Sequence, residues 1–477
     1  MTGTPKPSND YVIAPPVPDR QPGLATPHHK GRGALIAMLA AATLVLAGAI
    51  GTGVWLLQDP GHENNKPATA GASKASLPWS VPAKVSGLRS PGLVRGVWFT
   101  DKAVVHALPD GTAALDRSTG RRMWGTPTPG AGSLCRASTD STDNIAILAY
   151  GAGEDCGTFY ALDITTGKVL WQHTLEPDDQ APSGPTRIAR SGETVVVSTE
   201  KKRTTAFRVR DGREIWHESK ELYQATAQGD CRGTQYTGGR ILLRVQYCLD
   251  GTFNERYDLA ALDPVTGKAR WTYRLSSEGL HAQVVSTSPI VVNDPGKGLG
   301  LPLGLTVLDD NGNLRTRLAT GPEHLGKHAE GDGSTPFPDV QIKGDKLYFV
   351  AAKDDSTPDQ NNKIIAWSLD SGRRLWERTS SGYLQAYHAV ASDTNDVLAY
   401  TAGNIHDPAT LVRFDPATGT PTIVRTYPPT PQEAIVGPFP LPYLNHGTLY
   451  LLASPESAVP GWETEKRQKA LLALPGT

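Results

Sequence analysis

The chain of 477 residues has few cysteines and no excess of charge, and these shortages exclude several kinds of protein. Its four cysteines include no adjacent pair, and no two of them have the C-x-x-C spacing of tetrahedral metal sites. Lys and Arg total 47 against 48 Asp and Glu, so the charge balance gives no support to nucleic-acid binding. The glycine-rich stretch 296–300 lacks the G-x-x-x-x-G-K-[ST] order, so we interpret it as a loop and not as a phosphate site.

The N-terminal region lacks cysteine as well, because the first cysteine of the chain is Cys135. A lipoprotein carries its lipidated cysteine at the end of the apolar leader, so this class is excluded. The stretch 33–57 contains no charged residue and can cross roughly 30 Å of hydrocarbon at about 1.5 Å per residue. We predict a single transmembrane helix there. A cleaved signal peptide is the alternative, since Ala47-Gly48-Ala49 has the form of a cleavage site.

The segments beside this stretch differ in composition. Residues 1–32 are rich in proline and have almost no apolar periodicity, so we expect a disordered tail. Basic residues precede the apolar stretch and acidic residues follow it, which places the tail in the cytoplasm by the positive-inside rule. Residues 58–76 are mostly small or polar and predict a flexible extracellular stalk. Residues 77–477 then form the exported part of a single-pass protein of the cell membrane.

The exported part is organised around a repeated turn. Its best copy, 161–171, reads A-L-D-I-T-T-G-K-V-L-W, and 114–124 and 261–271 also fit the pattern A-L-D-x-x-T-G-x-x-x-W. The turn glycines recur roughly every 45 to 60 residues, which is the spacing of four-stranded propeller blades. Shortened copies with the tryptophan are 210–216 and 369–376, and copies without it are 308–312 and 414–419.

Each position of this pattern has a physical task. The apolar residues before Asp form a strand, the carboxylate accepts amide hydrogens of the turn, and Gly adopts a positive φ without a Cβ clash. The residues after Gly begin the return strand, on which the Trp lies. An isolated hairpin is only marginally stable in water, so stacked repeats must bury its apolar faces.

This pattern resembles the repeat of quinoprotein-like (PQQ-like) β-propellers, where it is called the tryptophan docking motif. The paired G-H and W-D signature and the repeated Gly-Gly pairs of other propeller types are absent. The resemblance implies an all-β fold in which the motif tryptophans pack between adjacent blades. These residues are Trp124, Trp171, Trp216, Trp271 and Trp376, joined by Trp79 in an N-terminal strand.

The two ends of the exported part together supply the last blade. The stretch 469–476 has the sequence of a strand before a turn, but no outer strand follows it, and 77–81 (L-P-W-S-V) has the sequence of the missing strand. We predict that the two strands pair, which closes the ring and removes its open edges. The predicted fold is therefore an eight-bladed quinoprotein-like β-propeller, preceded by a single N-terminal transmembrane helix.

All four cysteines lie in the exported part, where disulfides are permitted. Cys135 and Cys231 precede Arg in predicted inner strands, whereas Cys156 and Cys248 follow predicted second strands. Of the three possible connectivities, this parallel placement favours Cys135 with Cys156 and Cys231 with Cys248. We therefore expect one disulfide within each of two blades.

The loops of the predicted blades fall into two sets, one on each face of the ring. The turns of the first set are short, whereas the second set contains the long polar insertions and leans acidic. Insertions that collect on one face often mark the binding face of a repeat protein. An acidic face suits a basic ligand, although charge that merely keeps loops soluble explains it equally well. The insertions are 248–256, 294–302, 320–336, 353–362 and 454–467.

Three functions remain open on this sequence. A membrane-anchored binding or scaffolding module fits the compact blades, the stalk and the loop-rich face. A quinone-dependent dehydrogenase is the alternative, but enzymes of the resembled family carry a vicinal disulfide and calcium ligands, and no adjacent cysteines exist here. An extracellular sensor would need a separate signalling partner, because the cytoplasmic tail is short. We predict no enzymatic activity, no cofactor and no metal, with an unknown envelope protein or small ligand as partner.

Overall fold

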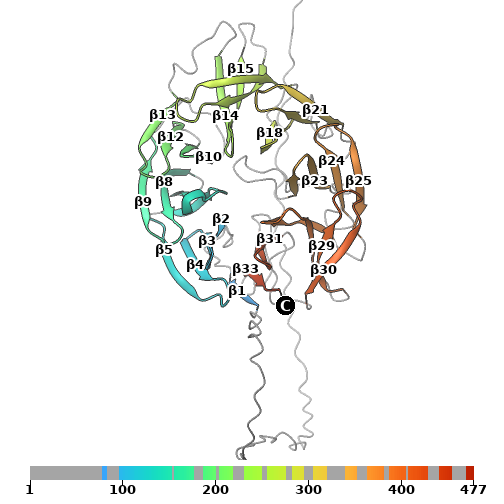
Figure 1. The fold of residues 1–477 in the computed structure, drawn as a ribbon. Helices are drawn as coiled ribbons and strands as arrows, with labels where there is room; N and C mark the ends of the chain where they lie inside the picture. Colours follow the sequence, from blue (N-terminus) through green and yellow to red (C-terminus); the bar gives the residue numbers. More distant parts are fainter. Residues whose placement is uncertain are drawn as a thin grey trace, which may run out of the picture. The chain divides into compact units, whose positions relative to one another are not determined.

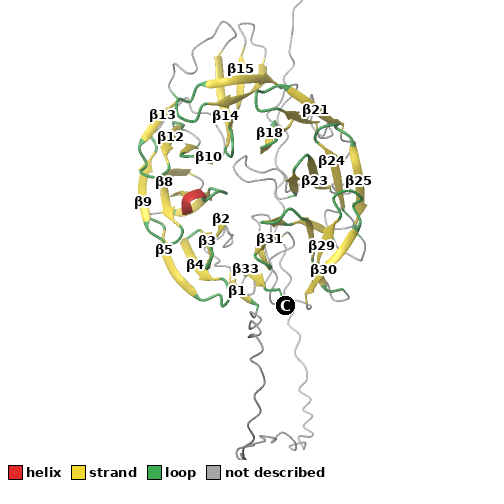
Figure 2. Ribbon diagram, in the orientation of Figure 1, coloured by secondary structure: helices red, strands yellow, loops and turns green. Residues whose placement is uncertain are grey.

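The computed structural model divides the chain into two units, 1–71 and 72–477, and the residues it describes all lie in the second. The predicted tail, transmembrane helix and stalk therefore lie outside the described residues. Within them, no helix is both long and apolar enough to cross a membrane, and the helix η1 (Thr142–Asn144) is a short 3-10 turn (Figure 2). The described ranges are 78–82, 96–130, 132–152, 155–176, 186–199, 203–218, 230–249, 255–275, 282–294, 304–319, 339–351, 362–380, 386–403, 407–427, 440–453 and 469–476.

The strands of the second unit form eight sheets arranged in a ring, each with one strand near the centre and one at the rim (Figure 1). We number the sheets as blades in chain order and call their strands inner, second, third and outer. The described strands within each blade pair antiparallel with their neighbours. The predicted all-β, eight-bladed propeller is therefore confirmed.

The first four blades follow one another along the chain. Blade 1 contains β2 (Gly96–Phe99), β3 (Ala103–Leu108), β4 (Gly111–Asp116) and β5 (Arg122–Pro127). Blade 2 contains β6 (Ser133–Ala137), β7 (Ile145–Ala152), β8 (Asp155–Asp163) and β9 (Val169–Thr174). Blade 3 contains β10 (Arg187–Ser191), β11 (Thr194–Ser198), β12 (Thr205–Arg208) and β13 (Glu214–His217). Blade 4 contains β14 (Asp230–Thr237), β15 (Leu242–Leu249), β16 (Glu255–Leu262) and β17 (Ala269–Arg274).

The other four blades complete the ring. Blade 5 contains β18 (Gln283–Thr287), β19 (Ile290–Asn293), β20 (Gly304–Leu308) and β21 (Leu314–Ala319). Blade 6 contains β22 (Val340–Lys343), β23 (Lys346–Ala351), β24 (Lys363–Ser368) and β25 (Arg374–Thr379). Blade 7 contains β26 (Tyr387–Ala389), β28 (Val397–Thr401), β29 (Ala409–Phe414) and β30 (Pro421–Tyr427). Blade 8 contains β31 (Pro440–Asn445), β32 (Thr448–Ala453), β33 (Lys469–Leu474) and β1 (Trp79–Pro82).

Blade 8 takes its outer strand from the opposite end of the propeller sequence. β1 pairs antiparallel with β33, with Trp79 opposite Ala473 and Val81 opposite Leu471. The prediction that the two ends close the ring is therefore confirmed. A further strand that the repeats did not predict, β27 (Ala391–Ser392), follows the inner strand of blade 7 and pairs in parallel with β31 of blade 8.

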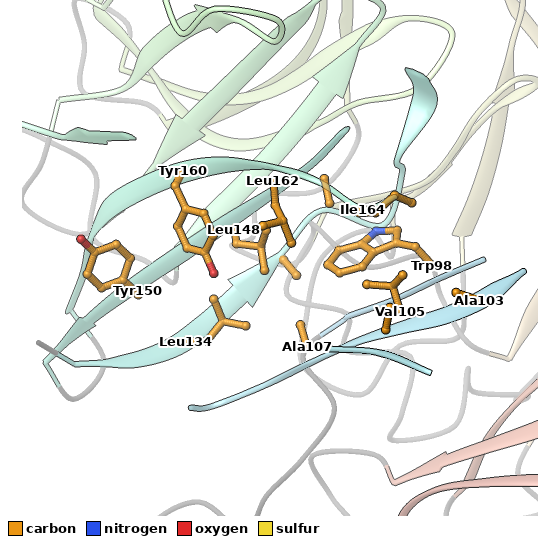
Figure 3. Packing of buried hydrophobic residues seen from close by; sticks show 13 residues of the cluster. Trp98, Ala103, Val105, Ala107, Leu134, Leu148, Tyr150, Tyr160, Leu162 and Ile164 are labelled. Atoms are coloured by element: carbon orange, nitrogen blue, oxygen red, sulfur yellow. The ribbon is translucent and has the colours of Figure 1, made fainter. Parts of the chain in front are cut away.

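Apolar side chains fill the eight seams between neighbouring blades, with one buried cluster in each seam. Between blades 1 and 2, Trp98 lies near Val105 and Leu162, and Tyr160 lies farther along the same cluster (Figure 3). The Trp98 indole nitrogen donates a hydrogen bond of 3.0 Å to the Ser138 carbonyl oxygen. Each blade therefore buries both of its faces, as the repeated apolar strands require.

A β-bulge recurs where the third and outer strands pair. In blades 1 to 6 it directly precedes the turn, as between Ala114 and Leu115 of blade 1. Blade 7 differs, because its bulge lies between Leu411 and Val412, two residues farther from the turn. In blade 8, whose third and outer strands come from opposite ends of the propeller sequence, the shift lies between Val81 and Pro82. Since an extra residue bends a strand and interrupts its alternation, the outer strand of blade 7 differs from the others.

Candidate functional site

The predicted docking tryptophans all reach from an outer strand to the turn of the next blade. Each indole nitrogen donates a hydrogen bond to a backbone carbonyl in that turn. A buried Trp needs such a partner for its N–H, so the contact also fixes how the ring lies. The donor–acceptor distances are Trp79 to Arg117 3.1 Å, Trp124 to Thr165 3.1 Å, Trp171 to Val209 2.7 Å, Trp216 to Pro264 2.9 Å, Trp271 to Asp310 2.8 Å and Trp376 to Pro416 3.2 Å.

The glycine of each turn is the surface on which a tryptophan ring lies. Gly212 has a φ of +70°, and a Cβ added there would come within 2.7 Å of the Trp171 ring. Glycine is therefore required twice at this position, once for the backbone conformation and once for the close approach. The same contact joins Trp79 to Gly120, Trp124 to Gly167, Trp216 to Gly267, Trp271 to Gly312 and Trp376 to Gly419.

The carboxylates of the turns stabilise the backbone on which each tryptophan ring lies. The hydroxyls of Ser118 and Thr119 hydrogen-bond the Asp116 carboxylate and lower its pKa. In blade 4, the Arg270 guanidinium and then the Thr266 amide lower the pKa of Asp263 to about 2. A depressed pKa means that the stabilisation is present above the unfolded pKa and is lost as the pH falls through the folded one. The turns therefore keep their shape at neutral pH and weaken in acid.

Two seams lack a docking tryptophan and are connected in other ways. Between blades 5 and 6, Thr316 takes the tryptophan's place against Gly372, and Arg315 pairs with Asp370 of the next turn. Between blades 7 and 8, the corresponding residue is Ile423, whose side chain is 62% exposed and so is not buried in the seam. Arg425 instead donates a hydrogen bond of 2.6 Å to the Gly447 carbonyl oxygen.

The seam between blades 7 and 8 is also connected through β27. After this short strand, the Asp393 carboxylate accepts a hydrogen bond of 3.1 Å from the His446 backbone amide of blade 8. Lys343 of blade 6 donates a hydrogen bond of 2.6 Å to the Thr394 carbonyl oxygen of the same loop. One loop of blade 7 thus contacts both neighbouring blades, and its contact with blade 8 lies in a seam without a docking tryptophan.

The cysteines lie as the predicted pairing requires, although Cys248 lies within a second strand and not after it. A disulfide joins Cys135 on β6 to Cys156 on β8, with the Cα atoms 6.3 Å apart. Cys231 on β14 lies directly opposite Cys248 on β15, and Cys248 is disulfide-bonded. The side chain of Cys231 lies outside the described ones. Cys156 follows the second strand β7, as expected, and lies on the third strand, whereas Cys248 lies within the second strand β15 and not after it.

A buried ionic network continues the seam between blades 3 and 4 beyond its apolar cluster. Arg244 on β15 lies 3.2 Å from a Glu218 carboxylate oxygen of blade 3, and their side chains are only 14% and 2% exposed. Arg244 also donates a hydrogen bond of 2.6 Å to Gln246. On β16, Arg256 lies 3.2 Å from the Asp258 carboxylate, whose Oδ2 is 3.5 Å from the Cys248 sulfur. Charges removed from water in this way are tolerated because each has a partner of opposite sign.

The repeat pattern did not predict this network, although the alternating polarity of β15 indicates it. β15 reads L-L-R-V-Q-Y-C-L, in which polar residues alternate with apolar ones inside a blade that is covered on both faces. Arg244, Gln246 and Cys248 therefore share one face of the strand. A strand buried on both sides that still alternates in polarity indicates polar groups paired across a seam.

The predicted loop-rich binding face lies largely outside the described residues, so its insertions are not placed. In the ranges that the structure does describe, no three His, Cys, Asp or Glu side chains are grouped so that they could hold a metal ion. The tryptophan contacts, the ionic network and the outer edges of the blades are thus the features on which a function can be argued.

Eight four-stranded blades, six of whose seams hold a tryptophan docked on the glycine turn of the next blade, define a quinoprotein-like β-propeller. Residues 71–221 and 218–423 match the sequence profile of the family described as outer membrane protein assembly factor BamB. The chain belongs to this family. A search of curated protein sequences finds no match.

Several solved structures are similar to this chain at low sequence identity. BamB from Moraxella catarrhalis is 14% identical with a TM-score of 0.43, and the alignment covers 83% of this chain and 97% of that one. The quinohemoprotein alcohol dehydrogenase ADHIIG from Pseudomonas putida HK5 is 13% identical with a TM-score of 0.49, covering 83% and 75%. The computationally designed Ika8 protein is 17% identical with a TM-score of 0.45, covering 78% and 96%.

Proposed function

We propose that this chain is a membrane-anchored propeller that acts as a protein-binding scaffold in the cell envelope. The observation that carries the proposal is the match of residues 71–423 to a family described as an outer membrane protein assembly factor. The uncharged stretch 33–57 is proposed as the anchor, with the tail 1–32 in the cytoplasm and the propeller outside.

The described seams support a scaffold because they make the ring a stiff frame. Buried apolar clusters fill each seam, and six of the seams add a hydrogen bond from a docking tryptophan. A stiff frame holds loops and strand edges in fixed positions, so a partner does not have to order them when it binds. Such pre-organisation is what a binding module needs, and it requires no catalytic group.

The proposal predicts a stable partner in the cell's own envelope. We would tag the full chain at its C-terminus, cross-link intact cells and purify the chain from the membrane fraction under denaturing conditions. The expected result is one envelope protein captured in amounts comparable to the chain, and a propeller that external protease reaches in intact spheroplasts. A matched control is an unrelated tagged protein with the same anchor. Recovery in the cytoplasmic fraction, or capture equal to the control, would contradict the proposal.

We also propose that the chain does not carry out quinone-dependent oxidation. The sequence has no adjacent cysteines to stack on a quinone ring, which is the feature that the resembled enzymes carry. Purified protein supplied with pyrroloquinoline quinone and calcium should neither bind the quinone stoichiometrically nor reduce an acceptor dye with alcohols or sugars. Equilibrium dialysis and the dye assay test the two parts separately. Tight binding together with dye reduction would establish the dehydrogenase alternative.

A further inference from the structure

The outer strand of blade 7, β30, combines three features that no other described outer strand brings together, although β21 also lacks a docking tryptophan. It has no docking tryptophan, its bulge is displaced from the turn, and it exposes two adjacent apolar side chains. Ile423 is 62% exposed and Val424 is 40% exposed. Across the part of the chain that the structure describes, no other two large exposed apolar residues are adjacent.

The main chain of β30 is open on its outer side. Its sheet ends at this strand, and no other described strand pairs with it, so one row of backbone amide and carbonyl groups faces outward (Figure 1). An edge of this kind is a template for another extended chain, which gains hydrogen bonds from the backbone and specificity from the side chains.

Six of the other seven outer strands carry features that discourage such pairing. β1 ends at Pro82, which has no amide hydrogen to donate. β9 has neither a proline nor an Asp, Glu, Lys or Arg, but it exposes only one large apolar side chain, Leu170. Charged side chains on an edge oppose pairing with another strand. They are found on β5, β13, β17, β21 and β25, as Arg122, Glu214, Arg270, Arg274, Arg315, Arg317, Arg374, Glu377 and Arg378.

Charge near the β30 edge indicates what kind of strand fits it. Arg425 is the one charged residue of β30, and its guanidinium is already used by the Gly447 carbonyl of blade 8. Arg413, on the neighbouring strand opposite Thr422, is exposed and forms no ion pair with any residue that the structure describes. The edge therefore offers an apolar pair beside an uncompensated positive charge.

We propose that β30 is a docking edge for an extended segment of a partner protein, in which apolar residues alternate with acidic ones. The segment adds a fifth strand to blade 7, its apolar side chains cover Ile423 and Val424, and its carboxylates face Arg413. This inference rests on the proposed scaffold function and names the surface and the chemistry of the partner. Main-chain hydrogen bonds supply affinity, and the charge selects the sequence.

The test uses a fluorescent strand-length peptide of alternating valine and glutamate, with binding to the purified full chain measured by anisotropy. The double substitution Ile423→Lys and Val424→Lys should weaken binding by at least about tenfold, because it places two charges on the edge. Met123→Lys, at an exposed apolar site of another outer strand, is the matched control and should leave binding unchanged. A second peptide carries N-methylated valines, which cannot donate hydrogen bonds to the edge. It should bind the wild-type chain as weakly as the unmodified peptide binds the double variant.

A charge exchange adds a second readout that folding defects do not mimic. Arg413→Glu should weaken the valine–glutamate peptide and strengthen a valine–lysine peptide. Equal binding of the valine–glutamate peptide by the wild type and the double variant would overturn the inference. So would a wild-type dimer, seen in sedimentation, that the double substitution abolishes, because the edge would then pair with a second copy of the chain. If the envelope partner is still captured by the double variant, this edge is not the docking site while the scaffold function stands. If no partner is captured although the peptide result holds, the scaffold function fails and the edge remains a peptide site.

Discussion

Replacing Trp171 with Ala should lower the free energy of unfolding by about 3–5 kcal/mol. The side chain is only 8% exposed, its ring lies on Gly212 of the next blade, and Phe207 lies 5.9 Å from it between ring centroids. The substitution leaves a cavity in the seam and removes the hydrogen bond of 2.7 Å to the Val209 carbonyl. Urea unfolding followed by intrinsic fluorescence and by circular dichroism would measure the change.

The chain contains its own control for this experiment. Ile423 occupies the same position of the repeat as Trp171 but is exposed, so Ile423→Ala should change the free energy of unfolding by no more than about 0.5 kcal/mol. Trp171→Phe should fall between the two, because it keeps the apolar ring and loses the N–H donor. Equal stability of the Trp171→Ala and Ile423→Ala variants would show that the tryptophan does not hold the blades together.

Glu218→Ala should destabilise the propeller by a comparable amount, about 3–5 kcal/mol, although it removes a polar side chain. The substitution leaves the Arg244 guanidinium buried between blades 3 and 4 without the carboxylate that lies 3.2 Å from it. An uncompensated buried charge costs more than the pair contributes, because its solvation by water has already been lost. The same urea measurements would report the change.

Two controls separate the buried charge from the loss of an ion pair as such. Glu377→Ala removes the partner of Arg374 on the exposed outer strand β25, and should cost no more than about 1 kcal/mol. The double substitution Glu218→Leu and Arg244→Met removes both charges and should recover most of the stability lost by Glu218→Ala. A double variant no more stable than Glu218→Ala would mean that packing, and not the unpaired charge, dominates this seam.

The ring and its closure could be predicted from the sequence because the signals are local and repeated. The D-x-x-T-G turn fixes a hairpin within a few residues, and glycines such as Gly167 and Gly267 adopt the positive φ that the turn needs. The pairing of β1 with β33 could be predicted from the same pattern. The last blade lacked an outer strand after β33, and the first strand of the propeller sequence, β1, belonged to no complete blade.

Features that depend on packing between blades could not be predicted in this way. The contact of Arg244 with Glu218 joins two blades, and β27 pairs with β31 of the following blade. The displaced bulge of β30 is a choice of register between two strands, which the sequence P-T-I-V-R-T-Y does not reveal by its period. The candidate docking edge was missed for the same reason, because exposure of Ile423 follows from that register.

The closure of blade 8 by β1 has a consequence for how the protein is made. β1 leaves the ribosome before any complete blade, whereas its partner β33 belongs to the last blade to be synthesised. Seven blades can therefore form in order while the first strand stays unpaired and the ring remains an open arc. Because contacts between distant parts of a chain form slowly, the last step is the joining of the two ends. Until that step, β1 and the open edge of β33 remain unpaired, and unpaired strand edges of this kind are the sites at which an incomplete propeller aggregates.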